Sequence, residues 1–277
     1  MKKWQIIFIA LALALIIFAC LWKGIVRSEG FEENKPSKLK YINLVLYSDN
    51  EEYGEMKEIT QKYYKKFENV KTIYYKFDDK INEEYLMEGD VLKIKGKETY
   101  VPGILEKTVK AMEYVENDEY DYLVRSNIST IVDFKLLDEE LKKKQIEYGG
   151  GLINNLQRLD ENAGIKDNAH FGLNYVSGTA IIMSKNTLKE MIKQKDKIDY
   201  KIVDDVSIGV LMRLLKKEPV LVKEGSFLIV SDVNGDADKI IKMISEKTYI
   251  FYRNRNNDRK TDVKQMRIVI DYLLKRE

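Results

Sequence analysis

Two polar segments of this sequence carry side chains that could bind or activate a ligand. Asp204 and Asp205 follow an apolar stretch, and so does the segment SNIST, which contains Ser126, Asn127 and Ser129. Ligands of α/β sheets bind beyond the carboxyl ends of the strands, so we expect a site where these two segments lie. Each segment has an ordinary alternative, because aspartates stabilise helix N-termini and a short Ser/Asn segment is typical of a strand-end turn.

Four arginines are candidates for binding an anion. Arg125 directly precedes SNIST, and Arg253, Arg255 and Arg259 lie in a basic segment near the C-terminus. A guanidinium group presents a fork of N–H donors that suits phosphate oxygens. A basic run is equally typical of a solvated surface loop, so the late arginines keep both interpretations.

Other constellations indicate no site. The segment 232–238, DVNGDAD, resembles a calcium loop but lacks the Gly at its sixth position and the Glu at its twelfth. Gly149 to Gly151 are not accompanied by the Lys and Ser or Thr of a phosphate-binding loop, and we expect a flexible turn. His170 is the only histidine and Cys20 the only cysteine, which excludes disulfides and thiolate metal sites within the chain.

The N-terminal region predicts a membrane anchor. Residues 4–22 read WQIIFIALALALIIFACLW, without a charge, and as a helix they would extend roughly 28 Å, close to the thickness of a bilayer core. A cleaved signal peptide is the alternative, because two lysines before an apolar run also begin one. However, Phe18 is bulky where a cleavage site needs a small residue, and the apolar run continues past Cys20.

The rest of the chain has the composition of one soluble domain. The formal net charge is +2, which is too balanced to favour nucleic acid as a partner. The predicted organisation is a short polar N-terminus at 1–3, the anchor at 4–22, a linker at 23–40 and one domain at 41–277.

Strands and helices alternate along this domain. The spacing of apolar residues predicts strands at 41–48, 70–77, 120–125, 175–184, 220–224, 227–232 and 248–255, a hairpin at 91–101, and helices at 53–67, 105–115, 136–144, 186–195 and 262–274. The alternation predicts an α/β fold with a mixed, mainly parallel sheet that helices cover on both faces.

Several segments, in order, resemble the Fringe and β-1,3-galactosyltransferase type of glycosyltransferase. The match is carried by LEKTVKAMEYVENDEYDYLVRSNIST, YVSGTAIIMSKNTLKEM and IVDDVSIGVLM. The segments EYLMEGDVLKIKGKETYVPGILEKT and FYRNRNNDRKTDVKQM also resemble a divergent viral and microbial branch of such sequences.

The resemblance implies a GT-A fold and an inverting transfer of a sugar from a nucleoside diphosphate sugar to a glycan hydroxyl. It assigns the general base to Asp205, with Asp204 positioning it or the acceptor, and it places Ser177 and Gly178 on the acceptor side. The residues expected at the donor are Arg125, Ser126, Asn127, Ser129, Arg253, Arg255 and Arg259.

One departure concerns the cation. The family holds Mn²⁺ or Mg²⁺ through an Asp-x-Asp motif, but here Asn127 and Ser129 occupy the matching positions and offer only neutral oxygens. Phe251 lies near the place of the family's late histidine ligand. We therefore assign no metal ligand and leave the cofactor open, and without a cation the arginines would meet the charge of the diphosphate.

The function expected from the sequence is thus a single-pass, membrane-anchored glycosyltransferase. The alternatives are a relative that binds a glycan or nucleotide without turnover, and a membrane-tethered interaction domain. The orientation stays open, because lysines and arginines flank the anchor on both sides. The domain would face either the lumen of the Golgi or ER or the cytoplasm, and the sequon at Asn127 slightly favours the cytoplasm, because glycosylation there would block the donor site.

Overall fold

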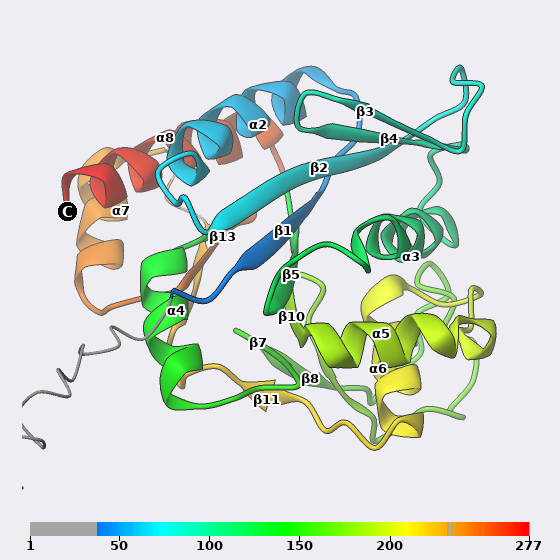
Figure 1. Ribbon diagram of the computed structural model, residues 1–277. Helices are drawn as coiled ribbons and strands as arrows, with labels where there is room; N and C mark the ends of the chain where they lie inside the picture. The colour runs from blue at the N-terminus through cyan, green and yellow to red at the C-terminus, as the bar shows by residue number, and fades with distance from the viewer. Residues whose placement is uncertain (1–37, 232, 234, 277) are drawn as a thin grey trace, which may run out of the picture. The chain divides into compact units, whose positions relative to one another are not determined.

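The computed structural model describes residues 38–231, 233 and 235–276 (Figure 1). The predicted anchor at 4–22 and the predicted linker up to residue 37 lie outside these residues. Within the described part of the chain, no helix combines the length and the apolar character needed to cross a bilayer.

A mixed eight-stranded sheet forms the centre of the described domain. Its strands, in their order across the sheet, are β11 (Val220–Leu221), β7 (Tyr148–Gly150), β10 (Ala180–Ser184), β5 (Tyr122–Asn127), β1 (Tyr41–Leu46), β2 (Val70–Asp78), β4 (Val91–Lys95) and β3 (Tyr85–Glu88). The pairs β1–β2, β1–β5, β2–β4 and β7–β11 are parallel, whereas β10 is antiparallel to both β5 and β7, and β3 to β4. The predicted mixed α/β sheet is thereby confirmed.

Two smaller sheets accompany it in the described residues. One contains β12 (Phe227–Val230), β13 (Phe251–Asn254) and β6 (Thr130–Val132), and the other contains β8 (Ile153–Asn155) and β9 (Asn174–Val176). Because β6 follows β5 after two residues, the three-stranded sheet lies next to the end of a central strand. It therefore brings β13, near the C-terminus, to the end of β5.

Helices cover both faces of the large sheet (Figure 1). They are α2 (Glu51–Tyr64), α3 (Gly103–Val115), α4 (Phe134–Lys143), α5 (Lys185–Lys193), α6 (Asp204–Leu214), α7 (Ala237–Ser245) and α8 (Arg259–Lys275), with a short 3₁₀ turn, η1 (Lys195–Lys197). Alternate residues of β1 divide between two cores, since Tyr41 and Val45 pack with α2, α4 and α8, whereas Ile42 and Leu44 pack with α3, α5 and α6. This two-sided burial explains why β1 is apolar at every position except Asn43.

Side-chain caps set where two helices begin. The Oδ1 of Asn50 accepts a hydrogen bond from the backbone N of Tyr53 at 2.7 Å, which starts α2. Asp258 accepts hydrogen bonds from the backbone N of Lys260 and Thr261, which starts α8. Such caps satisfy backbone donors that the helix leaves unpaired, and here they fix the first turns of α2 and α8.

The prediction of a hairpin within residues 91–101 was wrong, because only the first of its two strands forms. The structure pairs β3 with β4, so the hairpin turns at Gly89 and Asp90, and residues 96–101 form no strand. Gly89 has a φ of 61°, a left-handed conformation that glycine adopts without strain. The Glu-Gly-Asp turn therefore reverses the chain before the segment that the sequence pattern had suggested.

The expected turn at Gly149 to Gly151 was also wrong, because the first two glycines belong to β7. A Cβ at Gly149 would lie 2.3 Å from the backbone O of Val220, and one at Gly150 would lie 2.3 Å from that of Ala180. These glycines therefore allow close approach of β7 to neighbouring backbone. The strand predicted at 175–184 divides instead into β9 and β10, and residues 177–179 between them enter the site described next.

Candidate functional site

A cavity of about 730 Å³ opens where β1 and β5 end. Its lining includes Leu46 to Ser48 at the end of β1, the end of β5, the segment between β9 and β10, the start of α6 and the segment from β13 into α8. The predicted residues that line it are Arg125, Asn127, Ser129, Ser177, Gly178, Asp204, Asp205, Arg253, Arg255 and Arg259. Residues far apart in the sequence are thus brought together at the carboxyl ends of parallel strands, where ligands bind in α/β folds.

Ser126 is the predicted site residue that the structure does not bring to the cavity. It lies between Arg125 and Asn127 on β5, and successive side chains of a strand point to opposite faces. Its side chain is fully buried, and its Oγ has no hydrogen-bond partner among the described residues.

Arg125 and Asp204 form a buried ion pair at the floor of the cavity. The Arg125 side chain is 1% exposed, and its Nη2 lies 2.6 Å from the Oδ2 of Asp204, whose side chain is 7% exposed. Arg125 also donates hydrogen bonds to the Tyr75 hydroxyl at 3.3 Å, to the Oδ1 of Asn127 at 3.1 Å and to the backbone O of Gly178. Although burial opposes it, the Asp204 carboxylate raises the pKa of Arg125 above its usual value.

These contacts change the role expected for Arg125. Its donors are directed at protein acceptors, and its charge is balanced by Asp204. A role of Arg125 in binding the donor phosphates stays a prediction. Its contacts connect β5 to the segment at Gly178 and to the first turn of α6.

Asp205 is held beside this pair and titrates unusually. Its Oδ2 accepts a hydrogen bond from the backbone N of Gly178 and its Oδ1 one from that of Val206, both at 2.9 Å. Burial, and secondly the charge of Asp204, raise the pKa of Asp205 to about 6, although these hydrogen bonds and Arg125 oppose the shift. A carboxylate with a pKa near 6 is a better proton acceptor at neutral pH than an ordinary aspartate.

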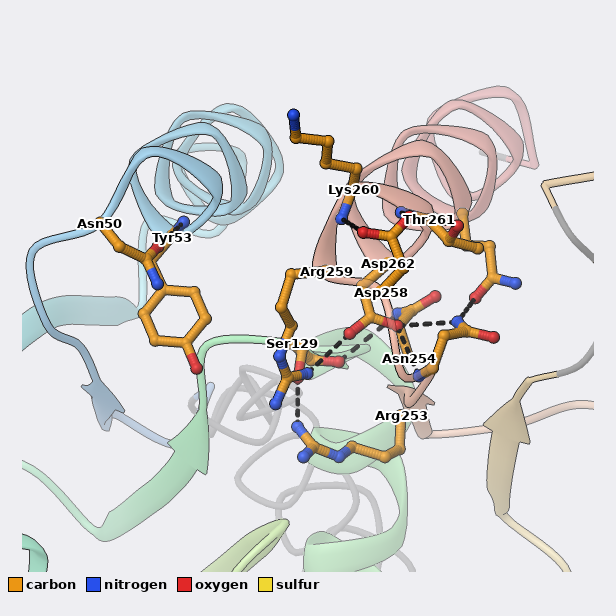
Figure 2. A network of polar contacts seen from close by, with 12 residues as sticks. Asn50, Tyr53, Ser129, Arg253, Asn254, Asp258, Arg259, Lys260, Thr261 and Asp262 are labelled. Carbon is orange, nitrogen blue, oxygen red and sulfur yellow. Dashed lines mark hydrogen bonds and ion pairs between the residues drawn. The ribbon is translucent and has the colours of Figure 1, made fainter. Parts of the chain in front are cut away.

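Three arginines line another part of the cavity wall, and Figure 2 shows two of them, Arg253 and Arg259. Arg253, on β13, donates a hydrogen bond to the Oγ of Ser129, and Arg259, the first residue of α8, forms an ion pair of 2.6 Å with Asp262. The Arg259 guanidinium also lies 5.8 Å from the ring centroid of Tyr53, which belongs to the first turn of α2. Arg255, which follows β13, is exposed.

The acceptor-side prediction falls on the segment between β9 and β10. The Oγ of Ser177 accepts hydrogen bonds from the backbone N and the Oγ1 of Thr179. A Cβ at Gly178 would lie 3.3 Å from both the Nη1 of Arg125 and the Oδ2 of Asp205. Gly178 therefore lets this segment approach the two charged side chains closely.

Several lining residues were missed by the sequence reasoning. Tyr47 directly follows β1, and the strand-end rule could have found it. Lys107, on α3, is 3% exposed at its side chain and forms an ion pair of 2.5 Å with Glu98, and it donates a hydrogen bond of 3.1 Å to the backbone O of Tyr47. Burial lowers the pKa of Lys107. No motif links Lys107 to Glu98, so no sequence signal marked this pair, and exposed Tyr100 beside them lacked one too.

Among residues 38–231, 233 and 235–276, no group of three or more His, Cys, Asp or Glu side chains is arranged to hold a metal ion. Compared with known proteins, the chain matches no protein-family model and no curated protein. The resemblance to glycosyltransferases therefore stays a prediction that the motifs alone carry.

Proposed function

We propose that this chain is a membrane-anchored glycosyltransferase with a GT-A-like domain. It transfers a sugar from a nucleoside diphosphate sugar to a hydroxyl of a glycan, with inversion. The proposal combines the motif resemblance with the contents of the cavity.

The observation that carries it is that Asp205 and the three arginines line the same cavity. Asp205, with its pKa near 6, lies on the wall formed by the start of α6, and Arg253, Arg255 and Arg259 lie on the wall formed by β13 and α8. Inverting transfer needs a base for the acceptor hydroxyl and cations for the leaving diphosphate. A cavity of about 730 Å³ also lies within the usual size range of small-molecule sites.

The reaction can be assigned to these residues. The acceptor oxygen attacks the anomeric carbon of the donor sugar while its proton passes to the carboxylate of Asp205. The bond between that carbon and the diphosphate oxygen breaks, and the diphosphate leaves with the electron pair. Arg125 and Asp204 hold the backbone of Gly178 and the first turn of α6 in register, which keeps Asp205 in position.

A second candidate function is ligand binding without turnover. Both carboxylate oxygens of Asp205 accept backbone hydrogen bonds, which is an ordinary stabilising arrangement at the start of a helix. A protein of this kind would bind a nucleotide or glycan in the same cavity and would need no base.

The test is to incubate the full-length chain, purified in detergent, with a panel of nucleoside diphosphate sugars and glycan acceptors. We expect the chain to transfer the sugar of at least one donor to an acceptor, or to hydrolyse that donor slowly. Asp205→Asn should abolish transfer and leave donor affinity almost unchanged, because it removes only the proton acceptor. Asp196→Asn, at an exposed aspartate outside the cavity, is the matched control and should retain full activity.

Two results would contradict the proposal. Donor binding with neither hydrolysis nor transfer would favour the binding protein, and the absence of any donor binding would favour an interaction domain. Unchanged turnover in Asp205→Asn would remove the base assignment.

A further inference from the structure

The two positions that match the family's acidic metal motif are engaged by arginines. The Oδ1 of Asn127 accepts a hydrogen bond from Arg125 at 3.1 Å, and the Oγ of Ser129 accepts one from Arg253. Both residues line the cavity. Guanidinium groups thus contact neutral oxygens at the two positions where the family has carboxylates that bind a cation.

The arginine cluster, defined as Arg253, Arg255 and Arg259, carries surplus positive charge. Arg259 is paired with Asp262, whose side chain is fully buried, whereas neither Arg253 nor Arg255 forms an ion pair within the described residues. The backbone donors at the start of α8 are already capped by Asp258. The positive character of this wall therefore comes from the side chains and not from an open helix terminus.

Arg253 lacks an acceptor for one of its donors. Its Nε is buried and has no hydrogen-bond partner among the residues that the structure describes, and Figure 2 shows its guanidinium directed toward Ser129. Burial and the charges of Arg259 and Arg255 lower the pKa of Arg253 to about 10, against an opposing effect of Asp262. A buried donor without a partner and like charges held together are both unfavourable, and an oxyanion would relieve both.

The cluster also faces a second cavity of about 440 Å³. This cavity is lined by the three arginines together with Ile229, Ser231, Asn256 and Asn257, so none of its described lining residues is acidic. The same arginines line both cavities. A ligand with two adjacent phosphate groups could therefore accept hydrogen bonds from guanidinium N–H groups at both phosphates.

We infer that Arg253, Arg255 and Arg259 bind the diphosphate of the donor in place of a divalent cation, so that donor binding and transfer proceed without metal. The inference rests on the proposed function, since it names how that donor is held. When the sugar leaves, these arginines stabilise the charge that develops on the diphosphate oxygen, while the acceptor proton goes to Asp205.

The test uses calorimetric titration of the full-length chain with inorganic pyrophosphate and with ADP, CDP, GDP and UDP, each in EDTA and in Mn²⁺. At least one diphosphate is expected to bind with the same affinity, within about twofold, in both buffers. Arg255→Gln and Arg253→Gln should each weaken binding on the order of 10- to 100-fold, the loss expected for one charge-assisted contact. Because Arg255 is exposed, its variant is expected to fold even if the Arg253 variant does not.

Arg267→Gln is the matched control, because Arg267 lies in α8, lines neither cavity and pairs with Glu55 on the surface. It removes the same charge and should leave affinity unchanged. Binding that requires Mn²⁺, or equal affinities for Arg255→Gln and Arg267→Gln, would overturn the inference.

The outcomes separate this inference from the proposed function. Transfer that disappears in EDTA would leave the function and overturn the metal-free site. Diphosphate binding in EDTA without transfer of any sugar would keep the arginine site and overturn the function, and no binding of any diphosphate would overturn both.

Discussion

Replacing Arg125 by methionine should destabilise the domain and shift the titration of its site. The substitution removes the partner of Asp204, whose side chain is only 7% exposed, and it removes the hydrogen bonds that Arg125 donates to the Tyr75 hydroxyl and to the backbone O of Gly178. Both effects follow from contacts that lie at the floor of the cavity.

The magnitude follows from the burial of the pair. Removing one partner of a buried ion pair costs about 3–5 kcal/mol, because the other charge is left without compensation. For a domain of this size, each kcal/mol lowers the Tm by roughly 2–4 °C, so the expected decrease is about 6–20 °C.

Thermal unfolding of the full-length chain, followed by circular dichroism, measures this decrease. Arg125→Lys keeps a positive charge near Asp204 and should lose less stability than Arg125→Met. A double variant, Arg125→Met with Asp204→Leu, removes both charges and should recover much of the loss, since a buried pair replaced by apolar side chains is often tolerated. The cycle therefore isolates the pair from the general effect of a smaller side chain.

A second measurement separates the charge from the packing. The positive charge of Arg125 lowers the pKa of Asp205, so Arg125→Met should raise that pKa above about 6 and move the acidic limb of the activity profile to higher pH. A Tm within about 2 °C of wild type, or single-variant losses that simply add in the double variant, would refute the reasoning.

Three further predictions concern the site and its supports. The rate of transfer should be half-maximal near pH 6 and should fall at lower pH, because protonated Asp205 accepts no proton; a pH profile of initial rates measures this. The folded state favours the neutral carboxyl of Asp205. Its contribution to the stability of the fold is therefore greatest at low pH and is lost as the pH rises through about 6. Gly149→Ala should lose about 1–3 kcal/mol in urea unfolding, because its Cβ would meet the backbone O of Val220, whereas Gly54→Ala in α2, where nothing lies within 4 Å, should gain up to about 1 kcal/mol. Asn50→Ala should lose about 1 kcal/mol in the same assay, because it removes the cap of α2.

Local spacing determined the order of the elements. Apolar residues at helical spacing in α2, α3 and α8, and the alternation of two buried faces in β1, follow from backbone geometry that each segment carries by itself. The strand-end rule likewise directed attention to Asp204, Asp205 and SNIST before any contact was known. The apolar run at 4–22 is read in the same way and stays a prediction from the sequence.

Which strands pair was not readable from the sequence. The sequence pattern placed the hairpin within residues 91–101, whereas β4 pairs with β3 and this hairpin depends on the turn at Gly89. Gly149 and Gly150 resemble a turn in isolation, and only the approach of Val220 and Ala180 shows why a strand needs them there. Pairing is decided by contacts between distant segments, which local propensity does not contain.

The sequence by itself determined which side chains with useful chemistry this protein has and roughly where its strands end. Only the tertiary structure decided what those side chains do: it neutralised Arg125 with Asp204, turned Ser126 into the core, and placed Arg253 against Ser129, 124 positions away. The physical reason is that a side chain's charge and hydrogen-bonding capacity belong to its residue type, whereas its partners depend on how the chain closes on itself.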